Sequence, residues 1–253
     1  MNVLVCYKVV YEEQDITVSN SGELSFDRAE LKLSLYDLNA VEAGVQIASA
    51  TGGTLKALSA GDNKIENAKL KKALLSRGPA ELFLVKDNSL QNADSNQTAK
   101  VLSEAAKKIG YDLILCGDGS GDIYAQQTGI LLGEMLGIPV INSVSKITVQ
   151  NDSVLVERSL EDSFEELEVT LPALLCVSSD INEPKVPGMK DILAAGKKPV
   201  TEWSLQDISV SSPEGKVDVL SVLAPKKVDR KCIIVEGDDK TAEFFENIKN
   251  DIK

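Results

Sequence analysis

Short apolar runs alternate with helical patterns over about the first 145 residues of the chain. The predicted strands are residues 2–7, 55–58, 82–85 and 113–116. The predicted helices are residues 37–50, 63–76, 95–109 and 123–136, several of them stopped by glycine or proline. Because a helix follows each strand, this part of the chain predicts a parallel sheet with right-handed crossovers.

The pattern changes in the second half of the chain. Residues 153–158 and 166–170 alternate in polarity and predict a hairpin, and residues 173–178 form another apolar strand. Proline and glycine then surround a short helix at residues 189–195. The prediction is an α/β fold with a doubly wound, mostly parallel, Rossmann-like sheet of the adenine nucleotide alpha hydrolase-like type, carrying a hairpin and a C-terminal extension.

The C-terminal part of the chain is polar and weakly patterned. It contains one apolar run at residues 232–235 and a predicted last helix near residues 241–252. Such a segment buries little apolar surface by itself. We therefore predict one domain over residues 1–200 and a C-terminal extension over residues 201–253 that packs on a partner subunit.

Charge and hydropathy exclude several classes of partner. The formal net charge is −12 and the pI is near 4.6, which argues against nucleic acid and against anionic membrane surfaces. No apolar run reaches the roughly 18 residues of a membrane span, and the first apolar run is too short for a signal peptide. A cytoplasmic location is the expectation.

The chain contains no histidine, which removes the commonest general base and metal ligand. The cysteines Cys6, Cys116, Cys176 and Cys232 are far apart in sequence, and three lie in apolar runs. Buried, reduced thiols are the simplest interpretation, and they suit a reducing cytoplasm. We predict no metal site and no nucleophile–base pair.

The strongest local feature is the segment 117–122, which follows the fourth predicted strand and carries three glycines. Glycines allow close backbone approach to a ligand, and a helix N-terminus after them suits a phosphate. The spacing matches neither a Walker loop nor the dinucleotide fingerprint. From the residues alone, nucleotide binding and an ordinary glycine-rich turn both remain open. Asp62, at another helix start, is read as an N-cap.

The wider sequence resembles the beta subunits of electron-transfer flavoproteins over about residues 1–200. Residues 117–129, GDGSGDIYAQQTG, resemble the family's adenine-nucleotide segment, and the start VLVCYKVV resembles its first strand and lysine. Residues 36–42, YDLNAVE, and residues 182–199 resemble two further family segments. Short segments such as DIYAQQTG and SSDIN are most similar to sequences of the FixA-like branch, which is linked with carnitine metabolism.

The resemblance implies an electron-carrying heterodimer rather than an enzyme with its own group-transfer catalysis. A FixB-like alpha subunit would hold the redox-active FAD, and this subunit would hold an adenine nucleotide, usually AMP. The residues that match the nucleotide site are Cys6, Tyr36, Asp37, Ala60, Gly61, Gly117, Asp118, Gly119, Ser120, Gly121, Asp122, Ile123, Tyr124, Ala125, Gln126, Gln127 and Thr128.

A second FAD in place of AMP is the alternative for this site. The family's electron-bifurcating branch has an Ala-Asp-Thr-x-x-Thr-Ala loop, and residues 93–99, ADSNQTA, resemble it. This resemblance adds Asp94, Ser95 and Thr98 to the candidate cofactor contacts. The same residues could simply form a helix N-cap. The choice between AMP and FAD remains open at this point.

The resemblance also implies docking on a dehydrogenase of the acyl-CoA type. Met189 occupies the position of the family's apolar docking residue, whereas Ile192 and Leu193 are expected to face inward. Ser159 stands where many members have glutamate beside the partner's flavin, so that role does not carry over. A stress-sensor type nucleotide-binding regulator and an ATP-dependent enzyme of the same fold are the alternatives. Those sensors lack the segment at residues 182–199.

Overall fold

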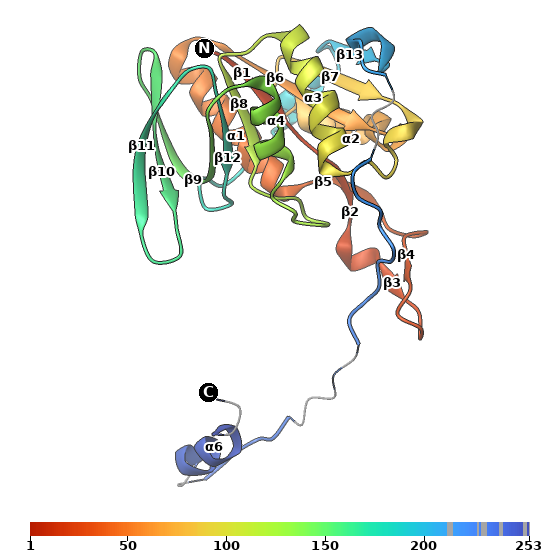
Figure 1. Cartoon of the computed structure of the whole chain (residues 1–253), viewed down its shortest axis with the longest axis vertical. Coiled ribbons are helices and arrows are strands. Elements are labelled where there is room, and N and C mark those ends of the chain that lie inside the picture. The colour runs from red at the N-terminus through yellow and green to blue at the C-terminus, as the bar shows by residue number, and fades with distance from the viewer. Residues whose placement is uncertain (212–214, 227, 229–231, 238–239, 250–251, 253) are drawn as a thin grey trace. The chain divides into compact units, whose positions relative to one another are not determined.

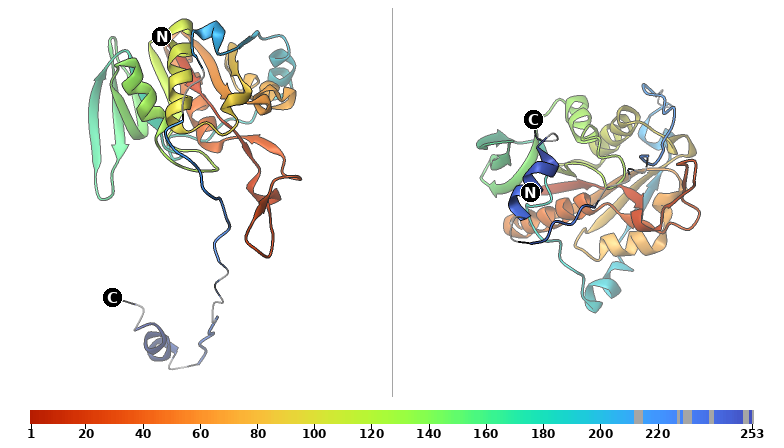
Figure 2. Two further views of the ribbon diagram at one scale, coloured as in Figure 1. Left: turned by 45° about the vertical axis from the view of Figure 1, so that its right-hand side comes forward. Right: turned by 90° about the horizontal axis from the view of Figure 1, so that it is seen from below.

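The computed structural model describes residues 1–211, 215–226, 228, 232–237, 240–249 and 252 (Figures 1 and 2). The chain forms two compact units. The larger one comprises Met1–Thr17 and Ser25–Ser221, and the smaller one comprises Val18–Leu24 and Val222–Lys253. The candidate site residues named above all lie in the larger unit.

A nine-stranded sheet forms the centre of the larger unit, in the order β11-β10-β9-β12-β8-β1-β6-β7-β13. The seven strands from β9 to β13 in this order pair in parallel. β10 and β11 continue the sheet in antiparallel pairing. The strands are β1 Asn2–Cys6, β6 Thr54–Gly61, β7 Glu81–Lys86, β8 Leu113–Gly117, β9 Val140–Val149, β10 Ser153–Ser159, β11 Phe164–Thr170, β12 Ala173–Val177 and β13 Val200–Trp203.

Helices cover both faces of this sheet (Figures 1 and 2). One face carries α1 Leu35–Thr51, α2 Ala68–Leu75 and α5 Met189–Ala195, and the other carries α3 Ser95–Ile109 and α4 Thr128–Leu136. Along β1, Val3 and Val5 pack toward α1, whereas Leu4 and Cys6 pack toward α3 and α4. Strands buried on both faces need a continuous apolar run, which is the pattern that predicted them.

The structure confirms the doubly wound, mostly parallel α/β fold, and the hairpin β10–β11 is present as predicted. One long strand was missed. β9 runs through residues 140–149, where polar side chains alternate with apolar ones, and its register shifts against both neighbours. The helix predicted over residues 63–76 is divided at Asn67, whose side chain accepts a hydrogen bond from the amide of Leu70 and starts α2.

The larger unit continues beyond residue 200. β13 pairs in parallel with β7 at the edge of the sheet, and Leu205, Ile208 and Val210 after it are buried against the α3 face. The first part of the predicted extension over residues 201–253 is thus packed within this unit as far as Val210. That the extension also packs on a partner stays a prediction.

The smaller elements lie outside the central sheet. β2 Val9–Tyr11 pairs with β5 Leu31–Leu33, and β3 Thr17–Val18 pairs with β4 Leu24–Ser25. In the smaller unit, Glu23 and Leu223 form an isolated bridge, and α6 spans Lys240–Ile248, which begins one residue before the range predicted for the last helix. The 3-10 turns are η1 Glu13–Asp15, η2 Asn63–Glu66, η3 Asn88–Leu90 and η4 Gln206–Ile208. No helix of the described part of the chain is both long and apolar enough to cross a bilayer.

Candidate functional site

The carboxyl ends of β1 and β8 lie next to each other in the middle of the sheet. The chain continues from β1 toward α1 on one face, whereas it continues from β8 toward α4 on the opposite face. In open parallel sheets this change of direction creates a crevice beyond the strand ends, where ligands bind. Residues 118–127, here called the glycine loop, follow β8 at this crevice.

Asp37, in the first turn of α1, joins the ends of these two strands. Its Oδ2 accepts the backbone N–H of Lys8 at 2.7 Å, and its Oδ1 accepts the backbone N–H of Gly117 at 3.2 Å. Burial raises the pKa of Asp37 to about 7, against the opposing effect of these hydrogen bonds. The carboxylate therefore holds the framework of the crevice.

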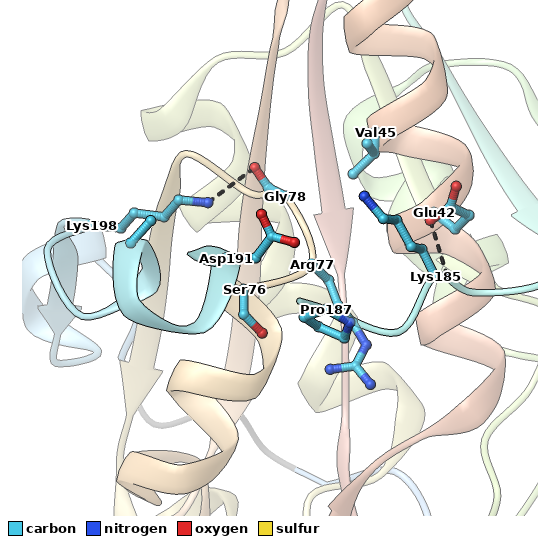
Figure 3. Close-up of a pocket in the computed structure, with 10 residues that line it drawn as sticks. Glu42, Val45, Ser76, Arg77, Gly78, Lys185, Pro187, Asp191 and Lys198 are labelled. Carbon is cyan, nitrogen blue, oxygen red and sulfur yellow. Dashed lines mark hydrogen bonds between the residues drawn. The ribbon is translucent and has the colours of Figure 1, made fainter. Parts of the chain in front are cut away.

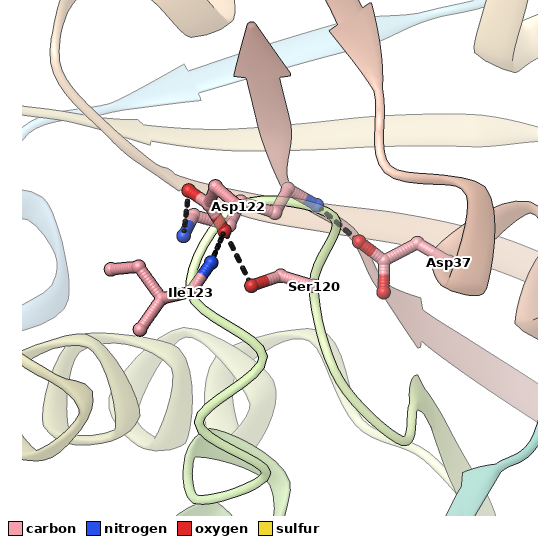
Figure 4. A network of polar contacts seen from close by, with 5 residues as sticks. Asp37, Ser120, Asp122 and Ile123 are labelled. Carbon is pink, nitrogen blue, oxygen red and sulfur yellow. Dashed lines mark hydrogen bonds and ion pairs between the residues drawn. The ribbon is translucent and has the colours of Figure 1, made fainter. Parts of the chain in front are cut away.

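Lys8 also reaches across to Asp122 of the glycine loop, and Figure 4 shows Asp122 beside Ser120 and Ile123. Its Nζ lies 2.6 Å from Oδ2 of Asp122, whose Oδ1 accepts the hydroxyl of Ser120 and the amide of Ile123. Burial raises the pKa of Asp122, but the hydrogen bonds from Lys8 and Ser120 outweigh it and bring the pKa below its usual range. The pair is partly exposed, so it contributes little to stability and leaves Lys8 able to contact a ligand phosphate.

The glycine loop is longer than the sequence indicated. We expected a helix from residue 123, but residues 123–127 are not helical and α4 begins at Thr128. Tyr124 and Gln126 adopt positive φ angles of 50° and 55°, which a right-handed helix cannot accommodate. Asp118 stabilises this backbone conformation of the loop. Its Oδ2 accepts a hydrogen bond from Nε2 of Gln126 at 2.6 Å, and its Oδ1 accepts one from the backbone N–H of Ser143 at 3.1 Å.

Two glycines of the loop have different surroundings. The ring of Tyr124 lies over Gly119, where a Cβ would come within 2.2 Å of the ring. The same ring packs on Tyr36, with 5.1 Å between ring centroids. At Gly121 a Cβ would meet only Val10, at 3.9 Å. Gly119 is thus needed for packing within the loop, whereas Gly121 leaves open space on which a ligand could lie.

The N-terminus of α4 has no side-chain cap. Gln127 stands at the cap position without a side-chain hydrogen bond to the helix, whereas α2 and α3 are capped by Asn67 and Asp94. The first amides of a helix need external acceptors, and a phosphate supplies them where no side chain does. The first turn of α4, beginning at Thr128, can therefore receive an anion.

The cysteines near the site are buried in the core on the α4 side. The thiol of Cys6 interacts with that of Cys116, and Cys176 lies in the neighbouring strand. Burial raises the pKa of Cys176 to about 12, and the pKa of Cys116 is raised by its hydrogen bond with Cys6 and by burial. The expectation of buried free thiols is confirmed for these three, whereas Cys232 is exposed.

The end of β6 contributes Ala60 and Gly61, both partly buried at the same edge of the sheet. A Cβ at Gly61 would come within 3.0 Å of Ile65. Asp62 follows and accepts the amide of Lys64 at 3.0 Å, so its predicted role as an N-cap is confirmed. This strand lies directly beside β1, so the predicted residues of both strands line one edge.

Asp94, Ser95 and Thr98 form a separate group at the start of α3, after β7. Oδ1 of Asp94 accepts the amide of Gln97 at 2.8 Å in a capping box, and its Oδ2 accepts the amides of Lys216 and Val217 at 2.6 and 3.1 Å. Burial raises the pKa of Asp94, but these backbone hydrogen bonds outweigh it and lower the pKa. Both carboxylate oxygens are thus used within the chain.

The fold therefore brings most predicted site residues to one edge, in two groups. The glycine loop, Tyr36, Asp37 and Cys6 gather around β1 and β8, and the Asp94 group lies beyond β6 and β7. Lys8 and Ser143 were not among the predicted contact residues. Lys8 directly follows the first predicted strand and is the lysine that the resemblance matched there, without being assigned a ligand contact.

A crossover segment over residues 178–199 connects β12 to β13 across the α1 and α2 side of the sheet. Asn39 of α1 and Asn182 hold it by reciprocal hydrogen bonds from each side-chain amide to the other residue's carbonyl, at 2.8 and 3.0 Å. Met189 is 73% exposed, Val186 84% and Leu193 65%. The expectation that Leu193 faces inward is wrong, because Ala195 is the residue of α5 that enters the core.

Fold and site together define a doubly wound α/β domain whose glycine loop lies at the carboxyl ends of its central strands. A family model described as the electron transfer flavoprotein domain matches residues 23–208. Because the match covers more than half of the chain, the protein belongs to the electron transfer flavoprotein domain family. Members of this family are electron carriers that generally bind FAD or AMP and pair with further subunits and dehydrogenases.

Proposed function

We propose that the chain is the beta-type, FixA-like subunit of a heterodimeric electron-transfer flavoprotein, and that it binds an adenine nucleotide at the glycine loop. The observation that carries this proposal is the loop's position at the crevice between β1 and β8, next to the uncapped N-terminus of α4. The FAD held mainly by an alpha subunit would supply the redox chemistry.

The chain's own residues suit the phosphate of such a nucleotide. The first amides of α4 are free of side-chain caps, Lys8 offers an exposed ammonium group, and the space at Gly121 is open. The exposed ring of Tyr124 offers a surface for a base at the same loop. Together these groups would bind and orient a nucleotide without performing group transfer.

AMP is favoured over a second FAD in this subunit. A larger dinucleotide that also used the Asp94 group would have to compete for the oxygens of Asp94, which already accept three backbone amides. The backbone at residues 216 and 217 would have to leave that position. A mononucleotide at the glycine loop requires neither change.

The crossover segment is the proposed docking element for a dehydrogenase of the acyl-CoA type. Met189 and Leu193 are one helical turn apart on α5, and together with Val186 they present exposed apolar side chains on a segment anchored by Asn182. Apolar side chains on a segment that is already held in place lose little conformational entropy when they bind a partner. A stress-sensor type regulator would have no use for this exposed segment, which disfavours that alternative.

The extension after Ser221 is proposed to pack on the alpha subunit. Its exposed apolar side chains include Ile234, Phe244 and Phe245, and Leu220 lies just before it. These four side chains are between 56% and 96% exposed. Exposed apolar groups in such number are typical of a surface that a partner covers. A role in carnitine-related reduction belongs to the same proposal, and it rests only on the resemblance of short sequence segments to the FixA-like branch.

Nucleotide binding is tested with Gly121→Val in the full chain. Its side chain would fill the open space where the ligand is placed, so the AMP affinity measured by calorimetry should fall at least about tenfold. Gly196→Val is the matched control, because a Cβ there is also uncrowded and lies on the crossover segment. Equal AMP affinity in both variants would remove the glycine loop from the proposal.

A further inference from the structure

A cavity of about 200 Å³ lies beneath the crossover segment, on the side of α1 and α2 (Figure 3). Lys185 and Lys198 enter it from the crossover, Arg77 from the end of α2, and Glu42 from α1. The end of α2 precedes β7, so this cavity is at the amino-terminal side of the parallel strands, opposite the glycine loop. It is therefore distinct from the proposed nucleotide site.

The three cations of the cavity have no carboxylate partner within the described residues. Arg77 donates from Nη1 to the carbonyl of Ala73, and Lys198 donates from Nζ to the carbonyls of Leu75 and Gly78. None of the ion pairs in the described chain includes Arg77, Lys185 or Lys198. With the carboxylates of Glu42 and Asp191, the lining of the cavity carries one net positive charge in a chain whose net charge is −12.

The two carboxylates that line the cavity are already engaged with the backbone. Oε2 of Glu42 accepts the amide of Lys185 at 3.3 Å, and Oδ2 of Asp191 accepts the amide of Gly188 at 3.0 Å. Both contacts stabilise the path of the crossover segment. Asp191 influences Lys198 only at longer range.

Partial burial disfavours the charged forms of Arg77 and Lys198. Burial lowers the pKa of Arg77 and that of Lys198, and Nε of Arg77 is buried without a hydrogen-bond partner in the described structure. A cation that loses hydration without gaining an anion is destabilised, and a bound anion would relieve this cost. The planar fork of arginine with two lysines is a donor set suited to a tetrahedral oxyanion.

We propose that this cavity binds a small oxyanion of the phosphate class, which joins Arg77, just after α2, to Lys185 and Lys198 of the crossover segment. Its volume suits one small anion and its water, because pockets for larger organic ligands start at roughly 300 Å³. Bound there, the anion fixes both ends of the segment that carries Met189. The site does not depend on the proposed electron-transfer function.

Calorimetric titration of the full chain with inorganic phosphate tests this proposal, and the part of the binding that belongs to the cavity is the part that the cavity variants remove. Lys185→Gln and Arg77→Gln should each weaken phosphate binding about tenfold or more, because each removes one charged hydrogen bond. Lys190→Gln is the control, since Lys190 is an exposed lysine on α5 that does not line the cavity. It should change the affinity less than about twofold.

A parallel titration with glycerol phosphate separates the two sources of the ligand. Tighter binding of inorganic phosphate identifies the free ion, and tighter binding of the ester identifies a phosphorylated metabolite; both support the site. Hydrogen exchange supplies a second readout, because phosphate should slow exchange at residues 185–198 in the wild type and not in Lys185→Gln. Absent binding of either compound, or equal losses in Lys185→Gln and Lys190→Gln, overturns the proposal.

Discussion

Three aspartates at the ligand edge accept backbone N–H groups. Asp37 joins β1 to β8, Asp94 holds the start of α3 together with residues 216 and 217, and Asp118 fixes the glycine loop to Ser143. Carboxylates that accept backbone N–H groups in this way set the positions of strand ends and loops. The glycine loop therefore presents its ligand face through Lys8, Tyr124 and backbone amides more than through these carboxylates.

The raised pKa of Asp37 gives a prediction for stability against pH. Its folded value of about 7 lies above the ordinary 3.8, so its stabilising contribution is complete at low pH and is lost as the pH rises through 7. Asp37→Asn cannot titrate. The unfolding free energy of the wild type minus that of Asp37→Asn should therefore decrease by on the order of 2 kcal/mol from pH 5 to pH 8.

Urea unfolding of both proteins across this pH range measures that difference. Subtracting the variant removes the contribution of other titrating groups that the two proteins share. A difference that stays constant from pH 5 to pH 8 would show that Asp37 is ionised throughout, and that its two hydrogen bonds outweigh its burial.

Single residues of the site were predictable only where the signal was local. The glycines of the loop and the N-cap at Asp62 follow from short-range pattern. The Lys8–Asp122 ion pair and the Tyr36–Tyr124 ring contact join parts of the chain that meet only in the folded sheet. No sequence periodicity encodes such pairs, so they required the structure.

At the scale of elements, the apolar strands and the amphipathic helix α3 were predictable because each buries a regular pattern. β9 was missed because it is half polar and interrupted at Ser143, which has a φ of 54°. The start of α4 was misplaced because Tyr124 and Gln126 adopt left-handed backbone conformations that their residue types rarely choose.

The crossover segment gives a prediction about partner docking. Met189→Ala should slow electron transfer with an acyl-CoA-type dehydrogenase severalfold, because an exposed anchor worth about 1–2 kcal/mol is removed. Leu193→Ala should act in the same direction, since Leu193 is exposed beside it. Stopped-flow flavin reduction with a reconstituted alpha subunit measures both rates.

Lys190→Ala serves as the control for this experiment, because it alters an exposed side chain of α5 without removing an apolar anchor. Melting temperature and nucleotide content should be unchanged in all three variants. If both Met189→Ala and Leu193→Ala transfer electrons at the wild-type rate, the crossover segment is not a docking element and only covers α1 and α2.

At the scale of the whole molecule, the layered sheet was predictable from the order of strands and helices, and the family was predictable from the resemblance of several sequence segments. The residues at which the compact unit ends were harder to predict from the sequence. β13 is only four residues long and follows a proline- and glycine-rich segment. No local sequence pattern therefore identified it as the edge strand of a sheet whose neighbouring strand, β7, lies more than 100 residues earlier in the chain. Its pairing with β7 is a long-range contact.

The extension gives a prediction about assembly. Deleting residues after Ala224 removes exposed apolar groups such as Ile234, Phe244 and Phe245, so the affinity for the alpha subunit should fall at least about tenfold. The parallel sheet should remain intact by circular dichroism, because its strands all precede the deletion. Analytical ultracentrifugation of the mixed subunits gives the affinity, and an unchanged value means that the extension has another role.

The central claim is that this chain is the nucleotide-holding half of an electron-carrying heterodimer. Native mass spectrometry of the chain co-purified with a FixB-like alpha subunit, combined with its visible absorption spectrum, tests this most directly. The account predicts a one-to-one complex with a flavin spectrum, one FAD, and one AMP that stays with this chain when the subunits separate. A complex without flavin and without any adenine nucleotide, or no complex at all, would contradict it.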